Sequence, residues 1–135
     1  MNKGFTMIEL LTVIIILAGI MIIAIPSYTN VSYEIKKKSL ENKTNVITQS
    51  TLKFAKLHLI DDIKPAGNTC LNKEDCCKYY DLYDFVLEYG LYVAEEEKNG
   101  PVIINPETNT KLNGEVKICY DIEALDLNGE FIINE

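Results

Sequence analysis

Residues 5–25 read FTMIELLTVIIILAGIMIIAI, and this apolar run determines the architecture of the chain. At about 1.5 Å per residue, a helix of this length measures roughly 32 Å, which is enough to cross a hydrocarbon core of about 30 Å. The sequence therefore predicts a transmembrane helix. Its one carboxylate, Glu9, is costly in such surroundings, by about 2.5–3.5 kcal/mol at the centre of a span. Because of this cost, we expect Glu9 to have a function.

The residues around Glu9 form a motif. The sequence KGFTMIELL at residues 3–11 combines a short basic leader ending in Gly, then Phe, a hydroxyl residue, two apolar residues and Glu. It resembles the leader and first turn of type IV pilins and pseudopilins. Pro26 also falls where type IV pilins commonly carry a helix-kinking proline. The resemblance extends from Met1 to roughly Tyr28 and fades after that residue.

The resemblance implies how the chain is processed and assembled. In the family, a membrane peptidase cuts after the Gly, which is Gly4 here, and the new amino terminus on Phe5 is N-methylated. The apolar helices then pack in the core of a helical filament. Pairing between the amine of one subunit and the Glu of a neighbour sets the subunit register, and Glu9 is the matching residue. A secretory signal peptide fits less well, because Glu9 interrupts the apolar region and its exit reads AIPS at residues 24–27.

The implied function is structural. The resemblance indicates a major or minor pilin of a type IV pilus-like surface filament, or alternatively a pseudopilin of a type II secretion or competence (DNA-uptake) apparatus. A single-pass anchored binding domain would need neither Glu9 nor the Gly4-Phe5 site. The implied partners are other copies or other pilins, a prepilin peptidase and methyltransferase, an inner-membrane assembly platform, and the lipid bilayer before assembly. The implied location is that of a single-pass membrane protein with an extracytoplasmic C-terminal domain, later in a cell-surface pilus or pseudopilus.

The lysines point to the opposite orientation. Lys36, Lys37 and Lys38 follow the predicted span, whereas only Lys3 and the terminal amine precede it. Read alone, the positive-inside rule places the C-terminal domain in the cytoplasm. We give more weight to the leader motif and the cysteines, because acidic residues flank the three lysines and large domains translocate with little regard to charge.

The composition is that of a small acidic domain attached to an apolar helix. The chain has 135 residues, a net charge of −7 and no Arg, and most of its carboxylates lie beyond Asp61. This length allows one small globular domain outside the span. The charge argues against direct nucleic acid binding, which needs a basic patch. All four cysteines lie from Cys70 to Cys119, and four thiols in a small extracellular domain predict disulfides.

The expected organisation is a leader at 1–4, a transmembrane and filament-core helix at 5–25, an amphipathic stalk helix at 26–63 and a small α+β head at 64–135. Pro26 lacks an amide hydrogen, so we expect it to kink or break the helix. Apolar residues at spacings of three and four predict that the helix resumes. Its face with Val46, Phe54 and Ile60 is expected to line the core of the head.

The head is predicted to contain one short helix and three strands. The helix is expected from Asp81 to Tyr89, with Gly90 after its end. Three β-like runs follow, at residues 102–104, 115–122 and 130–133, and the turn dipeptides Asn113-Gly114 and Asn128-Gly129 precede the last two. The predicted fold class is α+β: a long hydrophobic N-terminal helix, first transmembrane and then an amphipathic stalk, packed on a small antiparallel β-meander. The resemblance to type IV pilins implies the same architecture.

The run at residues 115–122 alternates between two faces. Its apolar face is predicted to carry Val116, Ile118, Tyr120 and Ile122. Cys119 lies on the opposite, polar face, whereas a free buried thiol would belong on the apolar one. We therefore expect Cys119 to form a disulfide that fastens a loop over the outer face of the sheet.

Two disulfide connectivities are open. Cys119 joins either Cys76 or Cys77, and Cys70 joins the other. Direct pairing of Cys76 with Cys77 would force a strained ring across one peptide bond. A zinc site made of the same four cysteines is the less favoured alternative, because adjacent cysteines lack the two-to-four-residue spacer of common zinc knuckles.

The last turn is rich in oxygen ligands. Asp121, Asp126 and Asn128 are candidate calcium ligands, since some pseudopilins bind calcium in a loop near this position. The spacing does not match an EF-hand loop, so a solvated acidic turn is the preferred interpretation, and no metal or cofactor is predicted. The run Glu95-Glu96-Glu97 is expected to be an exposed loop.

Catalysis has no support in the sequence. His58 is the only histidine, and it lies on the predicted stalk rather than near a cysteine or serine in a plausible cleft. There is no glycine-rich phosphate loop. The head tyrosines could form an adhesive surface, but packing of half-buried rings against the short helix is the preferred interpretation for Tyr79, Tyr80, Tyr83, Tyr89 and Tyr92. We expect a building block and not an enzyme.

Overall fold

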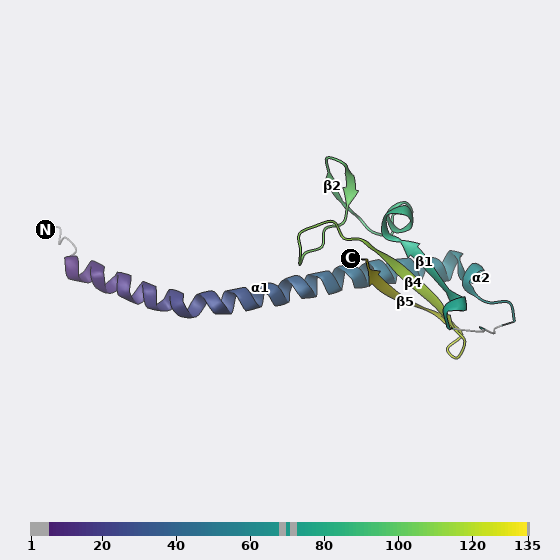
Figure 1. The fold of residues 1–135 in the computed structure, drawn as a ribbon, viewed down its shortest axis with the longest axis horizontal. Coiled ribbons are helices and arrows are strands. Elements are labelled where there is room, and N and C mark those ends of the chain that lie inside the picture. The colour runs from purple at the N-terminus through teal and green to yellow at the C-terminus, as the bar shows by residue number, and fades with distance from the viewer. Residues whose placement is uncertain (1–5, 68–69, 71–72, 135) are drawn as a thin grey trace. The chain divides into compact units, whose positions relative to one another are not determined.

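The computed structural model describes residues 6–67, 70 and 73–134 of the chain and is drawn as a ribbon in Figure 1. The chain divides into two compact units, Met1–Lys38 and Ser39–Glu135. Helix α1, Met7–His58, contributes residues to both units. The predicted leader and its cleavage site lie outside the described residues.

Helix α1 continues without interruption through Pro26. The sequence predicted a kink or a break at Pro26; the helix does not break there, and the kink stays a prediction. A proline inside a helix removes one backbone hydrogen bond, at a cost of about 3 kcal/mol or more, and long helical segments on both sides can absorb that cost. Helix α1 ends at His58, and the one-turn helix α2, Ile60–Ile63, follows.

No helix among the described residues has the length and the apolar character needed to cross a membrane. The transmembrane helix predicted at residues 5–25 is therefore wrong, and so is the predicted location as a single-pass membrane protein with an extracytoplasmic head. The span was predicted from the length and apolarity of the run, and the location also from the leader motif and the cysteines. In the structure, α1 begins only at Met7 and carries Glu9 in its first turn.

The described residues of the second unit form two small antiparallel sheets. The larger has the strand order β1-β4-β5, with β1 at Cys77–Asp81, β4 at Gly114–Asp121 and β5 at Asp126–Ile133. The smaller is a hairpin of β2, Glu95–Glu97, and β3, Gly100–Val102. The α+β class is therefore confirmed, but the strands do not form the single meander that was predicted.

Two strands lie where the sequence pattern predicts none. Strand β1 pairs with β4 along its whole length, although no β-like run was expected there. Strand β2 replaces the loop expected at Glu95-Glu96-Glu97, and its three side chains are exposed, as predicted. In both cases the pairing partner, and not the local pattern, defines the strand.

One face of the larger sheet contributes to the core of the second unit. On β4, Val116, Ile118 and Tyr120 are buried, as the alternation predicts. Ile122 was predicted to share this face, but it lies beyond the end of β4 and is 39% exposed. The buried face of β4 therefore ends at Tyr120.

The face of α1 that lines the core is shifted by one position along the sequence from the predicted face. The buried residues of α1 are Leu40, Ile47, Thr48, Thr51 and Ala55, whereas Val46 is 53% exposed. Steps of seven and four residues keep side chains on one helical face, and Ile47 fits these steps where Val46 does not. The Thr51 hydroxyl donates to the Ile47 carbonyl at 2.8 Å, so burial leaves this polar group satisfied.

The predicted short helix is present as η2, Leu82–Leu87, with π-type hydrogen bonding. Asp81 caps its start, because Asp81 Oδ1 accepts hydrogen bonds from the N–H groups of Tyr83 at 2.7 Å and Asp84 at 3.0 Å. Gly90 follows the helix with a φ of +64°, a conformation that favours glycine. The start and stop signals in the sequence were therefore correct.

Both predicted Asn-Gly turns are wrong. Gly114 opens β4, and Asn128-Gly129 lies inside β5. A Cβ at position 129 would lie 3.1 Å from Thr48 Cγ2, so this glycine allows α1 to approach the sheet. The β4–β5 turn lies at residues 122–125 instead, where Leu125 takes a φ of +53°.

Gly114 is a position where the sheet has no room for a side chain. A Cβ there would lie 2.5 Å from the backbone oxygen of Ile132 and 2.7 Å from the ring of Phe131. We therefore expect Gly114→Ala to lower the free energy of unfolding by about 1–3 kcal/mol. Urea denaturation followed by circular dichroism measures this change. The control Asn113→Ala removes an exposed side chain and should change stability by less than about 0.5 kcal/mol; equal losses in both variants would contradict the prediction.

Candidate functional site

The candidate functional site is the surface of α1 from Met7 to Ile23. Thirteen large apolar side chains in this segment are 49–92% exposed. Five of them, from Val13 to Leu17, are consecutive, and consecutive side chains of a helix point about 100° apart. The exposed apolar surface therefore surrounds the helix on all sides. None of these side chains belongs to the hydrophobic core cluster of the second unit.

Glu9 and Thr6 form a capping box at the start of α1. The backbone N–H and the hydroxyl of Thr6 both donate to Glu9 Oε2 at 2.9 Å, and the Glu9 N–H donates to Thr6 Oγ1 at 3.4 Å. These bonds satisfy N–H groups that lack a partner within the helix. The hydrogen bond from the Thr6 N–H, followed by that from its hydroxyl, lowers the pKa of Glu9. Glu9 Oε1 has no hydrogen-bond partner among the described residues.

This capping role was not predicted, although its signal is in the sequence. Thr6 followed three residues later by Glu9, before an apolar run, is the signature of a capping box. Thr12, the other hydroxyl residue of the segment, donates to the Ile8 carbonyl at 2.8 Å and is also satisfied within the helix. The surface of this segment is therefore apolar except for one carboxylate.

The other predicted residues of the processing site precede the first described residue. Gly4, the predicted cleavage residue, and Phe5, the predicted N-methylation residue, both lie outside the described part of the chain. Their roles, and the role of Glu9 in subunit assembly, stay predictions.

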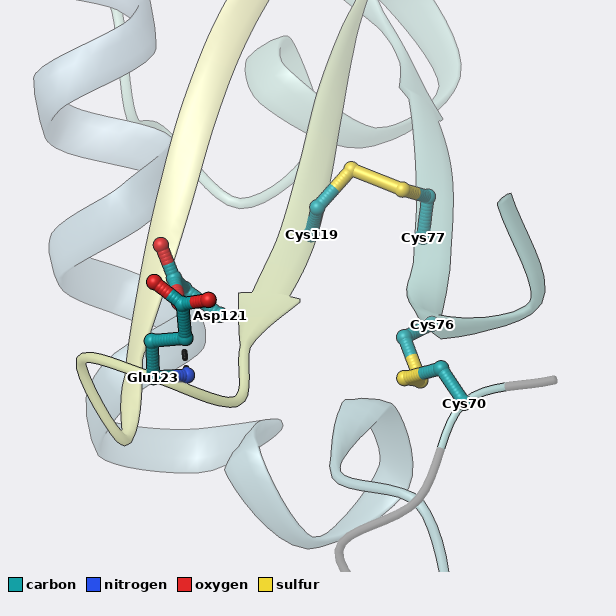
Figure 2. Close-up of a disulfide and its surroundings, with 6 residues drawn as sticks. All are labelled: Cys70, Cys76, Cys77, Cys119, Asp121 and Glu123. Atoms are coloured by element: carbon teal, nitrogen blue, oxygen red, sulfur yellow. Dashed lines mark hydrogen bonds between the residues drawn. A yellow bond between two sulfur atoms is a disulfide. The ribbon is translucent and has the colours of Figure 1, made fainter. Parts of the chain in front are cut away.

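Figure 2 shows the two disulfides of the second unit, Cys70–Cys76 and Cys77–Cys119. The prediction of two disulfides is confirmed, and the structure selects the connectivity in which Cys119 joins Cys77. These two cysteines lie directly opposite each other on β4 and β1. The prediction that Cys119 fastens a loop is therefore wrong, because its partner is on the neighbouring strand. The other bridge joins Cys70 to the end of the one-turn helix η1, Lys73–Cys76.

The predicted calcium candidates make other contacts. Asp121 Oδ1 accepts from the N–H groups of Glu123, at 2.9 Å, and Ala124, at 3.0 Å, and Asp121 Oδ2 accepts from Asn128 Nδ2 at 3.2 Å. The bond from Glu123 is the dashed line in Figure 2. Asp126 Oδ2 lies 2.6 Å from Lys56 Nζ, and this hydrogen bond lowers the pKa of Asp126. These contacts shape the β4–β5 turn and tie it to α1. Among the described residues, no group of three or more His, Cys, Asp or Glu could hold a metal ion.

Two of the head tyrosines have clear packing roles. The Tyr83 hydroxyl donates to the Leu112 carbonyl at 3.0 Å and accepts from the Ile103 N–H at 3.2 Å, and burial raises the pKa of Tyr83. The ring of Tyr80 lies 4.4 Å from that of Phe85, measured between centroids. Phe85 lies in η2, so the predicted packing against the short helix is confirmed for Tyr80, whereas Tyr83 belongs to that helix and ties it to Ile103 and Leu112. The more exposed tyrosines of the head are Tyr79, at 48%, and Tyr89, at 56%.

The second unit also has a pocket of about 470 Å³, between the loop at residues 105–113 and the end of β5. Part of its polar lining is engaged within the loop, because Asn105 Oδ1 accepts from the Glu107 N–H at 2.8 Å. No His or Cys is among the described residues that line the pocket. It therefore offers no nucleophile–histidine pair.

Comparison of the chain with protein-family models, with curated proteins and with solved structures finds no match. The functional interpretation therefore depends on the residues and contacts of this chain.

Proposed function

We propose that this chain is a structural subunit of a type IV pilus-like filament, a building block and not an enzyme. It assembles through the apolar segment of α1 after cleavage that follows Gly4. The observation that carries the proposal is the apolar surface that surrounds α1 from Met7 to Ile23. Full burial of one Leu or Ile side chain contributes about 1.5–3 kcal/mol, so covering thirteen large side chains strongly favours association.

The distribution of this surface favours a filament over a dimer. A two-helix dimer covers one stripe of each helix, as in a coiled coil, whereas a helix that is apolar on every side needs neighbours on every side. A head-to-tail interface that does not close into a ring builds an open helical array, and such an array gives each helix several neighbours. Copies of the same helix are apolar on all sides and therefore complementary to it.

Glu9 supplies the polar element of this assembly. Its Oε2 accepts the two Thr6 hydrogen bonds, while Oε1 has no partner in the described residues. Cleavage after Gly4 would place a cationic amine on Phe5, and a neighbour displaced along the filament could offer that amine to Glu9. Among packed apolar helices such a pair is buried, and breaking a buried pair costs about 3–5 kcal/mol. The pairing therefore selects one subunit register.

Three variants of Glu9 separate its capping role from its charge. Glu9→Gln keeps an oxygen that can accept from Thr6 but loses the charge, so we expect a normal helix and poor assembly. Glu9→Ala should lose both functions, and Glu9→Asp should be intermediate because its shorter arm reaches less far. A lost buried pair of about 3–5 kcal/mol predicts a drop in assembly of more than a hundredfold. Far-ultraviolet circular dichroism measures the helix, and sedimentation with electron microscopy measures the filaments.

The controls of this experiment address two different claims. Wild-type chain that starts at Phe5, verified by its mass, should form filaments, and failure to do so would contradict the proposed function. If wild type assembles and Glu9→Gln assembles equally well, the filament proposal stands and the register role of Glu9 is wrong.

A further inference from the structure

Charge is distributed unequally between the two units. Residues 39–135 contain nine lysines and eighteen carboxylates, a net charge of −9, whereas residues 1–38 contain four lysines and two carboxylates, a net charge of +2. Identical acidic heads that are brought together in a filament repel one another. A filament of such chains is therefore more stable if the heads contact the basic residues of their neighbours.

Three of the four lysines in the first unit are consecutive. Lys36, Lys37 and Lys38 lie on α1 and are exposed, beside the exposed apolar side chains of Val31 and Ile35. The ion pairs among the described residues involve Lys43 and Lys56 and none of these three. These three exposed side chains, which point about 100° apart around α1, therefore have no ion-pair partner within the described part of the chain.

The β2–β3 hairpin carries the complementary charge. Glu95, Glu96 and Glu97 are all exposed on β2, and Figure 1 shows the hairpin standing out from the larger sheet of its unit. Lys43 Nζ ties the base of the hairpin to α1, because it lies 3.4 Å from Glu95 Oε1 and donates to the Ile104 carbonyl at 2.7 Å. Glu96 and Glu97 have no ion-pair partner in the described part of the chain.

We propose that residues 36–38 of one copy bind the β2–β3 hairpin of a second copy. This interface rests on the proposed filament function and adds a contact outside the apolar segment. The exposed lysines of one copy and the exposed glutamates of the hairpin of another carry opposite charges, and the contact of Lys43 with Glu95 keeps the hairpin in place within its own unit. Charge complementarity then contributes to the choice of subunit register.

The test is a reciprocal charge reversal in the full chain. Lys36→Glu with Lys37→Glu reverses one side, and Glu96→Lys with Glu97→Lys reverses the other. Glu95 is left unchanged because it pairs with Lys43. Each one-sided reversal should raise the concentration needed for assembly about tenfold, since it replaces attraction with like-charge repulsion. The combination of all four changes should restore assembly to within about twofold of wild type.

A matched control carries the same charge change elsewhere on the head. Glu88→Lys with Glu123→Lys alters two exposed carboxylates outside the hairpin and should assemble within about twofold of wild type. Zero-length carbodiimide coupling in a mixture of isotope-labelled and unlabelled chains should join residues 36–38 of one chain to 96–97 of another.

The outcomes distinguish the two proposals. If wild type does not assemble, the proposed function is wrong. If wild type assembles and the reversals have no effect, or the control is equally impaired, the interface is wrong and the filament proposal stands. Impairment by the lysine reversal without rescue by the combination would mean that the lysines bind another anionic partner, and this would also overturn the interface.

Discussion

Lysine introduced singly at position 14, 15 or 16 should abolish filament assembly in every case. Ile14, Ile15 and Ile16 are 55%, 64% and 56% exposed in the single chain, and their side chains point about 100° apart around α1. If neighbours surround the helix, each lysine becomes a buried charge without a partner. The penalty for such a charge is several kcal/mol per ion, and the replaced Ile loses its own contribution of about 1.5–3 kcal/mol; a total of about 5 kcal/mol or more weakens assembly by more than a thousandfold.

The use of three consecutive positions tests whether neighbours surround α1 or cover only one side of it. A two-helix dimer would bury only the positions that lie on its seam, so at least one lysine variant would associate normally. Asn30→Lys is the control, because it adds the same charge to an exposed polar position of the same helix. The single chains should stay folded, with unfolding free energies within about 0.5 kcal/mol of wild type, since the replaced side chains are already in solvent. Sedimentation of each purified variant measures assembly, and normal assembly of any one of the three would contradict all-round burial.

The features that could be predicted from the sequence are those that depend on local periodicity or local capping. The alternation in β4 correctly placed Val116, Ile118 and Tyr120 in the core. Asp81 correctly marked the start of the short helix, because its carboxylate satisfies N–H groups within three residues of it. Two disulfides were predicted from four thiols in a small domain, and the strain of pairing adjacent cysteines left two connectivities open, between which the structure selects.

The features that could not be predicted depend on contacts distant in sequence. Among the described residues, strand β1 is an edge strand that pairs with β4, and its own sequence, CKYYD, has no clear alternation. Gly114 and Gly129 were taken as turn residues, but each avoids a clash, with Phe131 and Ile132 in one case and Thr48 in the other. A dipeptide rule cannot distinguish a glycine needed for a turn from a glycine needed for close packing.

At the candidate site, too, the sequence predicted some features and missed others. We predicted a function for Glu9 because a charge inside a transmembrane span has a high free-energy cost. In the structure Glu9 lies in the first turn of α1, where Thr6 saturates one of its oxygens. A carboxylate in the first turn is stabilised by the helix dipole and by the capping box, so its presence does not require a membrane. The all-round apolar surface was visible in the sequence, but its exposure in the single chain was not.

The Cys77–Cys119 bridge should be the larger contributor to the stability of the head. It closes a separation of 42 residues, whereas the Cys70–Cys76 bridge closes one of 6. In the loop-entropy model these separations correspond to about 4 kcal/mol and about 2 kcal/mol of unfolding free energy. We therefore expect Cys77→Ala with Cys119→Ala to destabilise the head about twice as much as Cys70→Ala with Cys76→Ala. Urea denaturation under non-reducing conditions measures both.

The burial of Cys76 works against the expected difference between the two double variants. Cys76 is only 2% exposed, so its replacement by Ala also leaves a small cavity, and this adds to the cost of removing the shorter bridge. If the Cys77→Ala, Cys119→Ala variant still loses more unfolding free energy, the difference cannot be due to this cavity. The longer bridge also holds the edge strand β1 on β4, so its removal should increase amide exchange in β1 first. Equal destabilisation by the two double variants, with β1 still protected, would mean that strand pairing and not the covalent bond holds β1 in place.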